Sequence, residues 1–122
     1  MIATFIVLAI LLALFVVANI WARVKIKRTP LPPDHPRVLQ LNDANFKAQL
    51  KNKLVLVDFW AEWCAPCRLM APVLNQLAAD LDGNCYVGKV NIERYPDLAR
   101  QYRIRSIPTL ILYKNGVEVQ RI

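Results

Sequence analysis

Side chains that commonly hold a metal ion are scarce in this chain: its 122 residues include three cysteines and one histidine. A structural zinc site normally needs four ligands of these types. The histidine, His35, lies in a proline-rich stretch without a second ligand nearby, so we expect it to be solvated and inert. We therefore predict no metal site within one copy, while a site shared between two copies stays open.

Charge is missing from the start of the chain. Residues 2–21 read IATFIVLAILLALFVVANIW and contain no charged side chain. A helix of about 20 residues spans the hydrocarbon core of a membrane, which is about 30 Å thick. The run is longer than the apolar part of a signal peptide, nothing basic precedes it except the amino terminus, and no cleavage site follows it. These features predict an uncleaved transmembrane anchor over residues 1–22, with Trp21 at the membrane interface.

Basic residues follow the apolar run immediately, at positions 23, 25, 27 and 28. Residues 1–37 account for +4 of the net charge of +7. We expect residues 2–21 and the basic stretch 23–28 to contact membrane lipids and their headgroups. Because basic flanks stay inside, the domain is expected to face the cytoplasm, with the extracytoplasmic side as the alternative. No basic helix face suggests a nucleic-acid partner.

The rest of the chain divides into a spacer and a folded domain. Residues 23–37 are basic and contain four prolines, which predicts a short, stiff spacer. Residues 38–122 alternate helical and strand patterns, which predicts an α/β domain with a mixed sheet and helices on both faces. We expect helices from residue 42 or 43 to 50, at 64–82 and at 96–102, and strands at 53–60, 85–92, 109–113 and 117–122.

Two of the cysteines lie three positions apart in the run VDFWAEWCAPCRLMAP, directly after an expected strand. A metal site is disfavoured by the shortage of other ligands. A purely structural disulfide is also disfavoured, because closing so small a loop removes little chain entropy. The remaining reading is a redox dithiol. Cys64 falls at the first turn of a helix, where unpaired N–H groups and the helix dipole stabilise a thiolate.

One helical turn separates the two thiols, so Cys67 can resolve a mixed disulfide that Cys64 forms. We expect Cys64 to be exposed and Cys67 to be more buried. Asp58 lies in the apolar run VLVDFW, where desolvation should raise its pKa and suit it to proton exchange near neutral pH. Alternatively, Asp58 forms an ion pair with Lys89 that only supports the strands. The third cysteine, Cys85, is interpreted as a small buried hydrophobic residue.

The cysteine-containing run resembles the active-site segment of the thioredoxin family. The resemblance continues through VGKVNIERYPDLARQYRIRSIPTLILYKNG and covers about residues 38–122. A C-x-x-C pair after a strand, in a βαβ setting and with Ser-Ile-Pro-Thr downstream, is specific in combination. The resemblance implies a thioredoxin-like fold, a central mixed sheet flanked by helices, here preceded by one N-terminal transmembrane helix.

Roles for individual residues follow from the resemblance. It implies that Cys64 is the attacking cysteine and Cys67 the resolving one. It also implies that Asp58 is the buried acid that moves a proton to or from the resolving cysteine, with Lys89 as its basic companion. The positions that bind substrate are implied to be Trp63, Pro66, Ile107 and Pro108, the last being the family's cis-proline.

As a whole, the resemblance implies a membrane-anchored reductase of protein disulfides. Its partners would be protein disulfide substrates and an upstream electron donor such as a thioredoxin reductase, and no bound cofactor is implied. Two alternatives stay open. One is thiol–disulfide exchange on the extracytoplasmic side, for cytochrome maturation or disulfide isomerisation. The other is a thioredoxin-shaped interaction module without catalysis.

The sequence departs from the family pattern at two places. The dipeptide between the cysteines is Ala65-Pro66, where the family usually has Gly-Pro, and this dipeptide helps to set the redox potential. The sequence also stops at Ile122, in the last expected strand, where the family continues into a C-terminal helix. If nothing follows, we expect a domain that is marginally stable alone or that a partner covers.

Overall fold

The structure, a computed structural model, describes residues 1–28 and 30–122, and the side chains of residues 26–28 are outside the description. Lys27 and Arg28, half of the predicted basic flank, therefore lie outside the described side chains. The chain forms two compact units, Met1–Pro30 and Leu31–Ile122, and each is described by itself.

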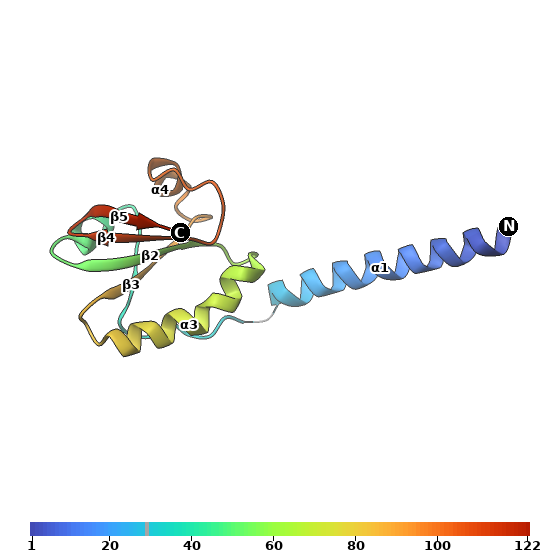
Figure 1. The fold of residues 1–122 in the computed structure, drawn as a ribbon, viewed down its shortest axis with the longest axis horizontal. Coiled ribbons are helices and arrows are strands. Elements are labelled where there is room, and N and C mark those ends of the chain that lie inside the picture. The colour runs from blue at the N-terminus through green and yellow to red at the C-terminus, as the bar shows by residue number, and fades with distance from the viewer. Residues whose placement is uncertain (29) are drawn as a thin grey trace. The chain divides into compact units, whose positions relative to one another are not determined.

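The first unit is one helix, α1, at Ile2–Arg28 (Figure 1). Its stretch Ile2–Lys25 includes an 18-residue window with a mean hydropathy of 2.8 and no buried residues, and it is long and apolar enough to cross a membrane. Asn19 turns its side-chain amide back onto the Phe15 carbonyl oxygen at 2.8 Å, which satisfies a polar group within the apolar surface. The basic stretch that was expected to begin the spacer continues the same helix to Arg28.

The second unit is built on a five-stranded mixed sheet in the order β1-β3-β2-β4-β5. Strands β1, β3 and β2 run parallel to one another, whereas β4 and β5 run antiparallel to their neighbours. The strands are β1 Val38–Gln40, β2 Leu54–Trp60, β3 Tyr86–Asn91, β4 Thr109–Lys114 and β5 Val117–Arg121. The central strands are apolar and β-branched, as buried parallel strands require.

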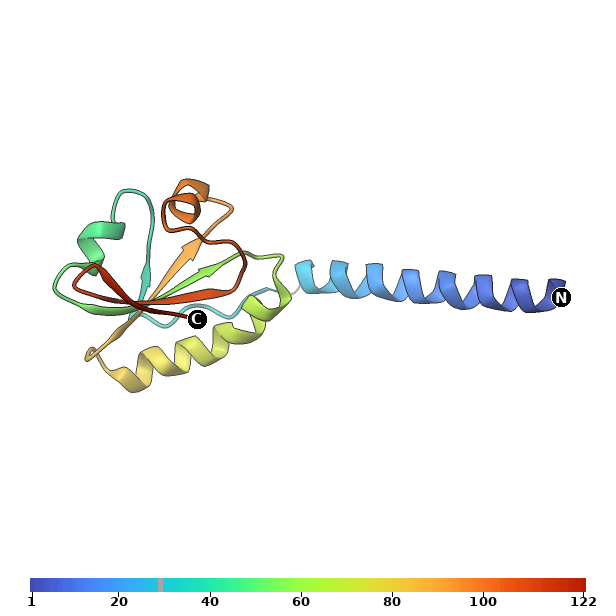
Figure 2. The ribbon, with the colours of Figure 1, turned by 45° about the horizontal axis from the view of Figure 1, so that its top comes forward.

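Three helices cover the sheet. Figure 2 shows α2 (Phe46–Leu50) and α4 (Pro96–Gln101) on one face and α3 (Ala65–Leu81) on the other. The larger core lies under α2 and α4 and contains these fully buried side chains of β2, β3 and β4: Val55, Val57, Phe59, Val90, Ile111 and Tyr113. A smaller cluster joins Leu74 and Ala78 of α3 to Val38 and Val87.

The mixed sheet with helices on both faces confirms the fold class that the sequence predicts. Two local predictions differ from the structure. The strand β1 was not predicted, because three residues are too short to carry a strand pattern. Helix α2, the first helix of the second unit, begins at Phe46 instead of residue 42 or 43. The reason is that the side-chain oxygen of Asn42 accepts hydrogen bonds from the N–H groups of Ala44 and Asn45 and forms a turn there.

Candidate redox site at the start of helix α3

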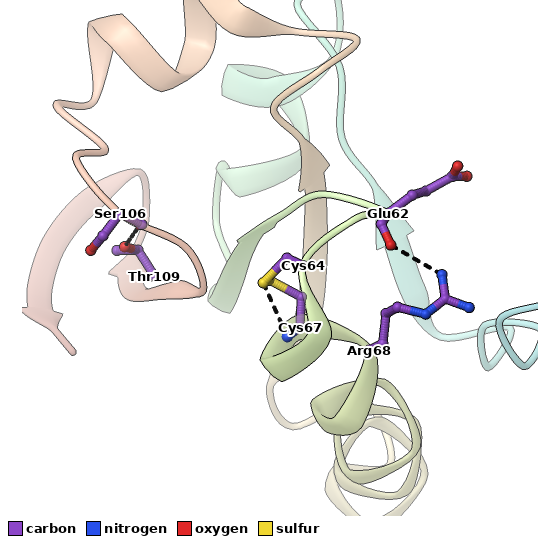
Figure 3. The surroundings of a disulfide bond; sticks show 6 residues. All are labelled: Glu62, Cys64, Cys67, Arg68, Ser106 and Thr109. Atoms are coloured by element: carbon purple, nitrogen blue, oxygen red, sulfur yellow. Dashed lines mark hydrogen bonds between the residues drawn. A yellow bond between two sulfur atoms is a disulfide. The ribbon is translucent and has the colours of Figure 1, made fainter. Parts of the chain in front are cut away.

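Cys64 and Cys67 form a disulfide at the N-terminal end of α3, with their Cα atoms 5.3 Å apart (Figure 3). Cys64 is the N-cap residue of the helix, and Pro66 lies in its first turn, where the missing N–H of proline is tolerated. The sulfur of Cys64 accepts the backbone N–H of Cys67 at 3.3 Å. The Arg68 guanidinium donates to the Glu62 carbonyl oxygen at 3.1 Å and ties the preceding loop to the helix.

Cys64 is as buried as Cys67 in this oxidised form: 4% of the surface of Cys64 and 3% of the surface of Cys67 is exposed. The expectation of an exposed Cys64 beside a more buried Cys67 is therefore wrong for this state. The physical reason is packing: the disulfide and Ala61 form a small apolar cluster that Trp60, Ile92 and Ile107 cover. Exposure does not distinguish the two sulfurs, whereas the N–H group that Cys64 accepts does.

Asp58 lies in β2, two residues before the end of the strand, and is 1% exposed. Its neighbours Val57 and Phe59 face the core under α2 and α4, so alternation along the strand turns Asp58 to the face that α3 covers. One carboxylate oxygen, Oδ1, has no hydrogen-bond partner. Desolvation raises the pKa of Asp58 to about 6, with Lys89 opposing that rise and Asp34 adding to it.

Lys89 stands directly opposite Asp58 in the register of β2 and β3, but its ion pair is with another acid. Its Nζ lies 3.0 Å from Oδ1 of Asp34 and 4.3 Å from the centre of the Trp60 ring. The expected alternative, an Asp58–Lys89 ion pair, does not form in the described part of the chain. Sequence reasoning missed Asp34, whose one signal is that it is the single acid among the first 37 residues.

The proline-rich segment also differs from its prediction, because it belongs to the second compact unit from Leu31 onward. His35, expected to be solvated, is half-buried, and its backbone N–H donates to the side-chain oxygen of Asn75 at 2.8 Å. Its ring nitrogen Nδ1 accepts the N–H of Arg37 at 3.1 Å. His35 is therefore held against α3 by hydrogen bonds and is part of the folded unit.

The four residues expected to bind substrate lie at two places, beside the disulfide at the start of α3 and on the loop before β4. Trp63 (53% exposed) and Pro66 (exposed) flank the disulfide. Ile107 and Pro108 are half-buried and joined by a cis peptide bond, the isomer that the resemblance implies. Ile107 packs against the cysteine cluster, and the loop is closed by a hydrogen bond from Thr109 Oγ1 to the Ser106 carbonyl oxygen at 2.5 Å (Figure 3). The start of α3 and this loop thus meet at the cysteines.

The other cysteine stands apart from this cluster. Cys85 precedes β3, is half-buried and donates its thiol to the Tyr86 carbonyl oxygen at 3.7 Å. Burial raises the pKa of this thiol, which makes it a poor nucleophile. Among the described residues, no three His, Cys, Asp or Glu side chains gather in a way that could hold a metal ion.

Comparison with known proteins identifies the same part of the chain. A family model described as thioredoxin matches residues 37–122. Similar proteins include the thioredoxins of Staphylococcus aureus strains Mu50 and MW2. Each is 41% identical over 85 residues, which cover 70% of this chain and 82% of the relative.

Proposed function

The chain belongs to the thioredoxin family and is a thiol–disulfide oxidoreductase, and we propose that it reduces protein disulfides while anchored in a membrane. The observation that carries this proposal is the Cys64–Cys67 disulfide at the start of α3, where Cys64 Sγ accepts a backbone N–H. Unpaired N–H groups and the helix dipole favour a negative charge at that point. Cys64 is therefore the attacking thiolate.

The first step transfers the substrate onto Cys64. The thiolate attacks one sulfur of the substrate disulfide, a mixed disulfide forms, and the other substrate sulfur leaves as a thiolate that takes up a proton. Pro66 and the short turn between the cysteines hold Cys67 one turn further along the helix. Cys67 is thus positioned to attack the mixed disulfide at the Cys64 sulfur.

The second step needs Cys67 to lose its proton. Asp58 is the base that takes it, because a buried carboxylate with a pKa of about 6 exchanges protons efficiently near neutral pH. The Cys67 thiolate then attacks Cys64, the second substrate sulfur leaves, and the Cys64–Cys67 disulfide is regenerated. Two electrons pass from the dithiol to the substrate, and Lys89 is the cation that accompanies Asp58.

The oxidised form must be reset by another dithiol. A thioredoxin reductase is the donor that this reaction calls for, and protein disulfides are the substrates. We assign substrate contact to Trp63 and Pro66 beside the cysteines and to Ile107 and Pro108 on the facing loop. An extended peptide can lie between the start of α3 and this loop and pair with free backbone groups.

We further propose that residues 1–22 anchor the protein and that the domain faces the cytoplasm. The length and hydropathy of α1 support the anchor. The basic residues that follow the apolar run, including Arg23 and Lys25, support the orientation and suit contact with lipid headgroups. An impermeant maleimide, applied to intact cells that express a Cys85→Ser variant, tests it. Labelling of the remaining cysteines under reducing conditions would place the domain on the extracytoplasmic side.

Substitution of the cysteines tests the chemistry. In the full chain in detergent, Cys64→Ser should abolish reduction of a protein disulfide such as that of insulin, a loss of at least about 1,000-fold, because no thiolate starts the reaction. Cys67→Ser should stall as a stable mixed disulfide with the substrate. Cys85→Ser is the matched control and should retain the parent rate. Full turnover by Cys64→Ser would refute the proposal.

The direction of electron flow is tested by the reduction potential of Cys64–Cys67. Equilibration of the full chain in glutathione buffers should give a value near about −270 mV, as expected for a reductant of the thioredoxin type. A value above about −200 mV would instead indicate an oxidant or an isomerase. That result would contradict the reductase assignment and leave the dithiol chemistry intact.

A further inference from the structure

The segment of residues 31–37, which lies between α1 and β1 in the chain, is fixed to the redox helix. Asn75 of α3 holds it at two points: its side-chain amide donates to the Pro33 carbonyl oxygen at 3.1 Å, and its side-chain oxygen accepts the N–H of His35 at 2.8 Å. The His35 carbonyl oxygen in turn accepts the N–H of Val38, the first residue of β1, at 2.9 Å. Asp34 is therefore clamped between two anchored neighbours.

The carboxylate of Asp34 is fully engaged inside the domain. Oδ1 pairs with the Lys89 ammonium at 3.0 Å, and Oδ2 accepts a hydrogen bond from the Gln40 amide at 2.6 Å. Lys89 is 5% exposed, and a buried ammonium is costly without an anionic partner. Trp60 covers the same ammonium at 4.3 Å. The Lys89 ammonium is thus ion-paired with Asp34 of the 31–37 segment.

Because Lys89 is paired with Asp34, the carboxylate oxygen Oδ1 of Asp58 is left buried without a hydrogen-bond partner. This is so although Lys89 is the register partner of Asp58 across the sheet. The groups that act electrostatically on Asp58 are Lys89 from β3 and Asp34 from the 31–37 segment, while the neighbouring cysteines carry no charge in the disulfide. A second carboxylate, that of Asp34, thus holds the ammonium of the residue that stands opposite Asp58 in the sheet.

We propose that Asp34 is a positioning residue of the redox site: it holds the Lys89 ammonium on its own carboxylate and keeps Asp58 unpaired for proton exchange with Cys67. The inference rests on the proposed function, because it acts through the role of Asp58 as a base. In this way the 31–37 segment, which follows α1 in the chain, affects the proton exchange of the dithiol. Asp34 touches neither substrate nor sulfur and acts through Lys89.

Removing the charge of Asp34 should release Lys89 to pair with Asp58. Both the loss of the neighbouring anion and the closer cation favour the ionised form of Asp58, so its pKa falls. In Asp34→Asn we expect the titration midpoint of Asp58 to fall by about one pH unit. The measurement is carbon-13 NMR of the carboxyl group in the oxidised full chain in detergent micelles, with the signal assigned by its loss in Asp58→Asn.

Two variants control the experiment. Asp34→Glu keeps the charge and should restore most of the parent midpoint. Asp82→Asn removes an exposed acid that pairs with Arg37 of the same segment at 3.1 Å, and it should leave the midpoint unchanged. If Asp34→Asn fails to fold, Lys89→Met is compared with Asp34→Asn/Lys89→Met, which leaves no buried cation unpaired. Without Lys89 only the direct effect of the Asp34 charge remains, so the midpoint of Asp58 should fall by clearly less than about one pH unit when Asp34 is neutral. A fall of a full unit would show that Asp34 acts on Asp58 directly and would overturn the inference.

The pH profile of disulfide reduction separates this inference from the proposed function. The limb assigned to Asp58 should move to lower pH in Asp34→Asn by the same shift as the NMR midpoint. An unchanged midpoint in Asp34→Asn, with reduction still slowed in Asp58→Asn, would overturn the inference and leave the proposed function standing. Reduction that is unaffected in Asp58→Asn would overturn the role of Asp58, and the inference with it.

Discussion

Asp58 is a carboxyl group that the fold keeps away from water and without a full set of hydrogen bonds. Burial raises its pKa from 3.8 to about 6, so the native state binds its proton more tightly than the unfolded chain does. Stability contributed by the protonated form is present below about pH 4 and is lost as the pH rises through 6. Above pH 6 the ionised group opposes folding.

Replacement of this group should therefore stabilise the domain in a pH-dependent way. Asp58→Asn should raise the free energy of unfolding relative to the parent by about 2.5 kcal/mol more at pH 8 than at pH 4, from about two pKa units at 1.36 kcal/mol each. Urea unfolding of the oxidised full chain in detergent, followed by tryptophan fluorescence, measures it. The exposed Asp43→Asn is the control, and a pH-independent difference for Asp58→Asn would contradict the argument.

At this scale the sequence identified the dithiol and the buried acid but not the partner of Lys89. Cys64, Cys67 and Asp58 were predictable because an acid in an apolar strand and two cysteines one helical turn apart are local patterns. Asp34 was not, because its ion pair joins residues that are 55 positions apart and lies in a proline-rich segment without periodicity. The burial of Cys64 depends on packing by a distant loop, which no local pattern records.

Among the elements, α3 connects the redox chemistry to the segment that follows α1 in the chain. Its N-cap is Cys64 and its first turn carries Cys67, while Asn75, two turns further on, holds both Pro33 and His35. The helix was predictable from its apolar spacing and from the glycine that follows it. Its second role, as a dock for the 31–37 segment, was not predictable from the sequence. A single asparagine in a helix is equally expected where the side chain is simply exposed to solvent.

Loss of the Asn75 side chain should loosen this dock. Asn75→Ala removes two hydrogen bonds to backbone groups and should lower the free energy of unfolding by about 2 kcal/mol, at about 1 kcal/mol for each bond. Gln76→Ala is the matched control, because its amide bonds to the Asp80 carboxylate one turn along the same helix. It should cost less than about 0.5 kcal/mol. The free energies of unfolding are measured by urea unfolding. Equal losses in the two variants would refute the claim that Asn75 stabilises the domain by fixing the 31–37 segment to α3.

For the whole molecule, the question is where the folded domain begins. The sequence predicts a boundary at residue 38, because the prolines before it exclude regular helix or sheet. In the structure, β1 also begins at Val38. The compact unit instead begins at Leu31. Prolines exclude helix and sheet but not packing, and the carbonyl and N–H groups of such a segment are free to bond side chains such as Asn75. The boundary of regular structure and the boundary of the compact unit therefore differ by seven residues.

Two fragments distinguish these boundaries. Residues 31–122 keep the Asp34–Lys89 ion pair and the bonds to Asn75, whereas residues 38–122 leave a buried ammonium without its acid. Breaking one side of a buried pair costs about 3–5 kcal/mol, so we expect the longer fragment to be more stable by about 3 kcal/mol, since Asp58 offers Lys89 a substitute partner. Urea unfolding of both oxidised fragments at pH 7 measures the difference. Equal unfolding midpoints would show that residues 31–37 are only a spacer. At pH 4 Asp58 is protonated and cannot replace Asp34 as the partner of Lys89. A smaller difference in stability between the fragments at pH 4 than at pH 7 would therefore contradict the proposed Lys89–Asp58 pairing.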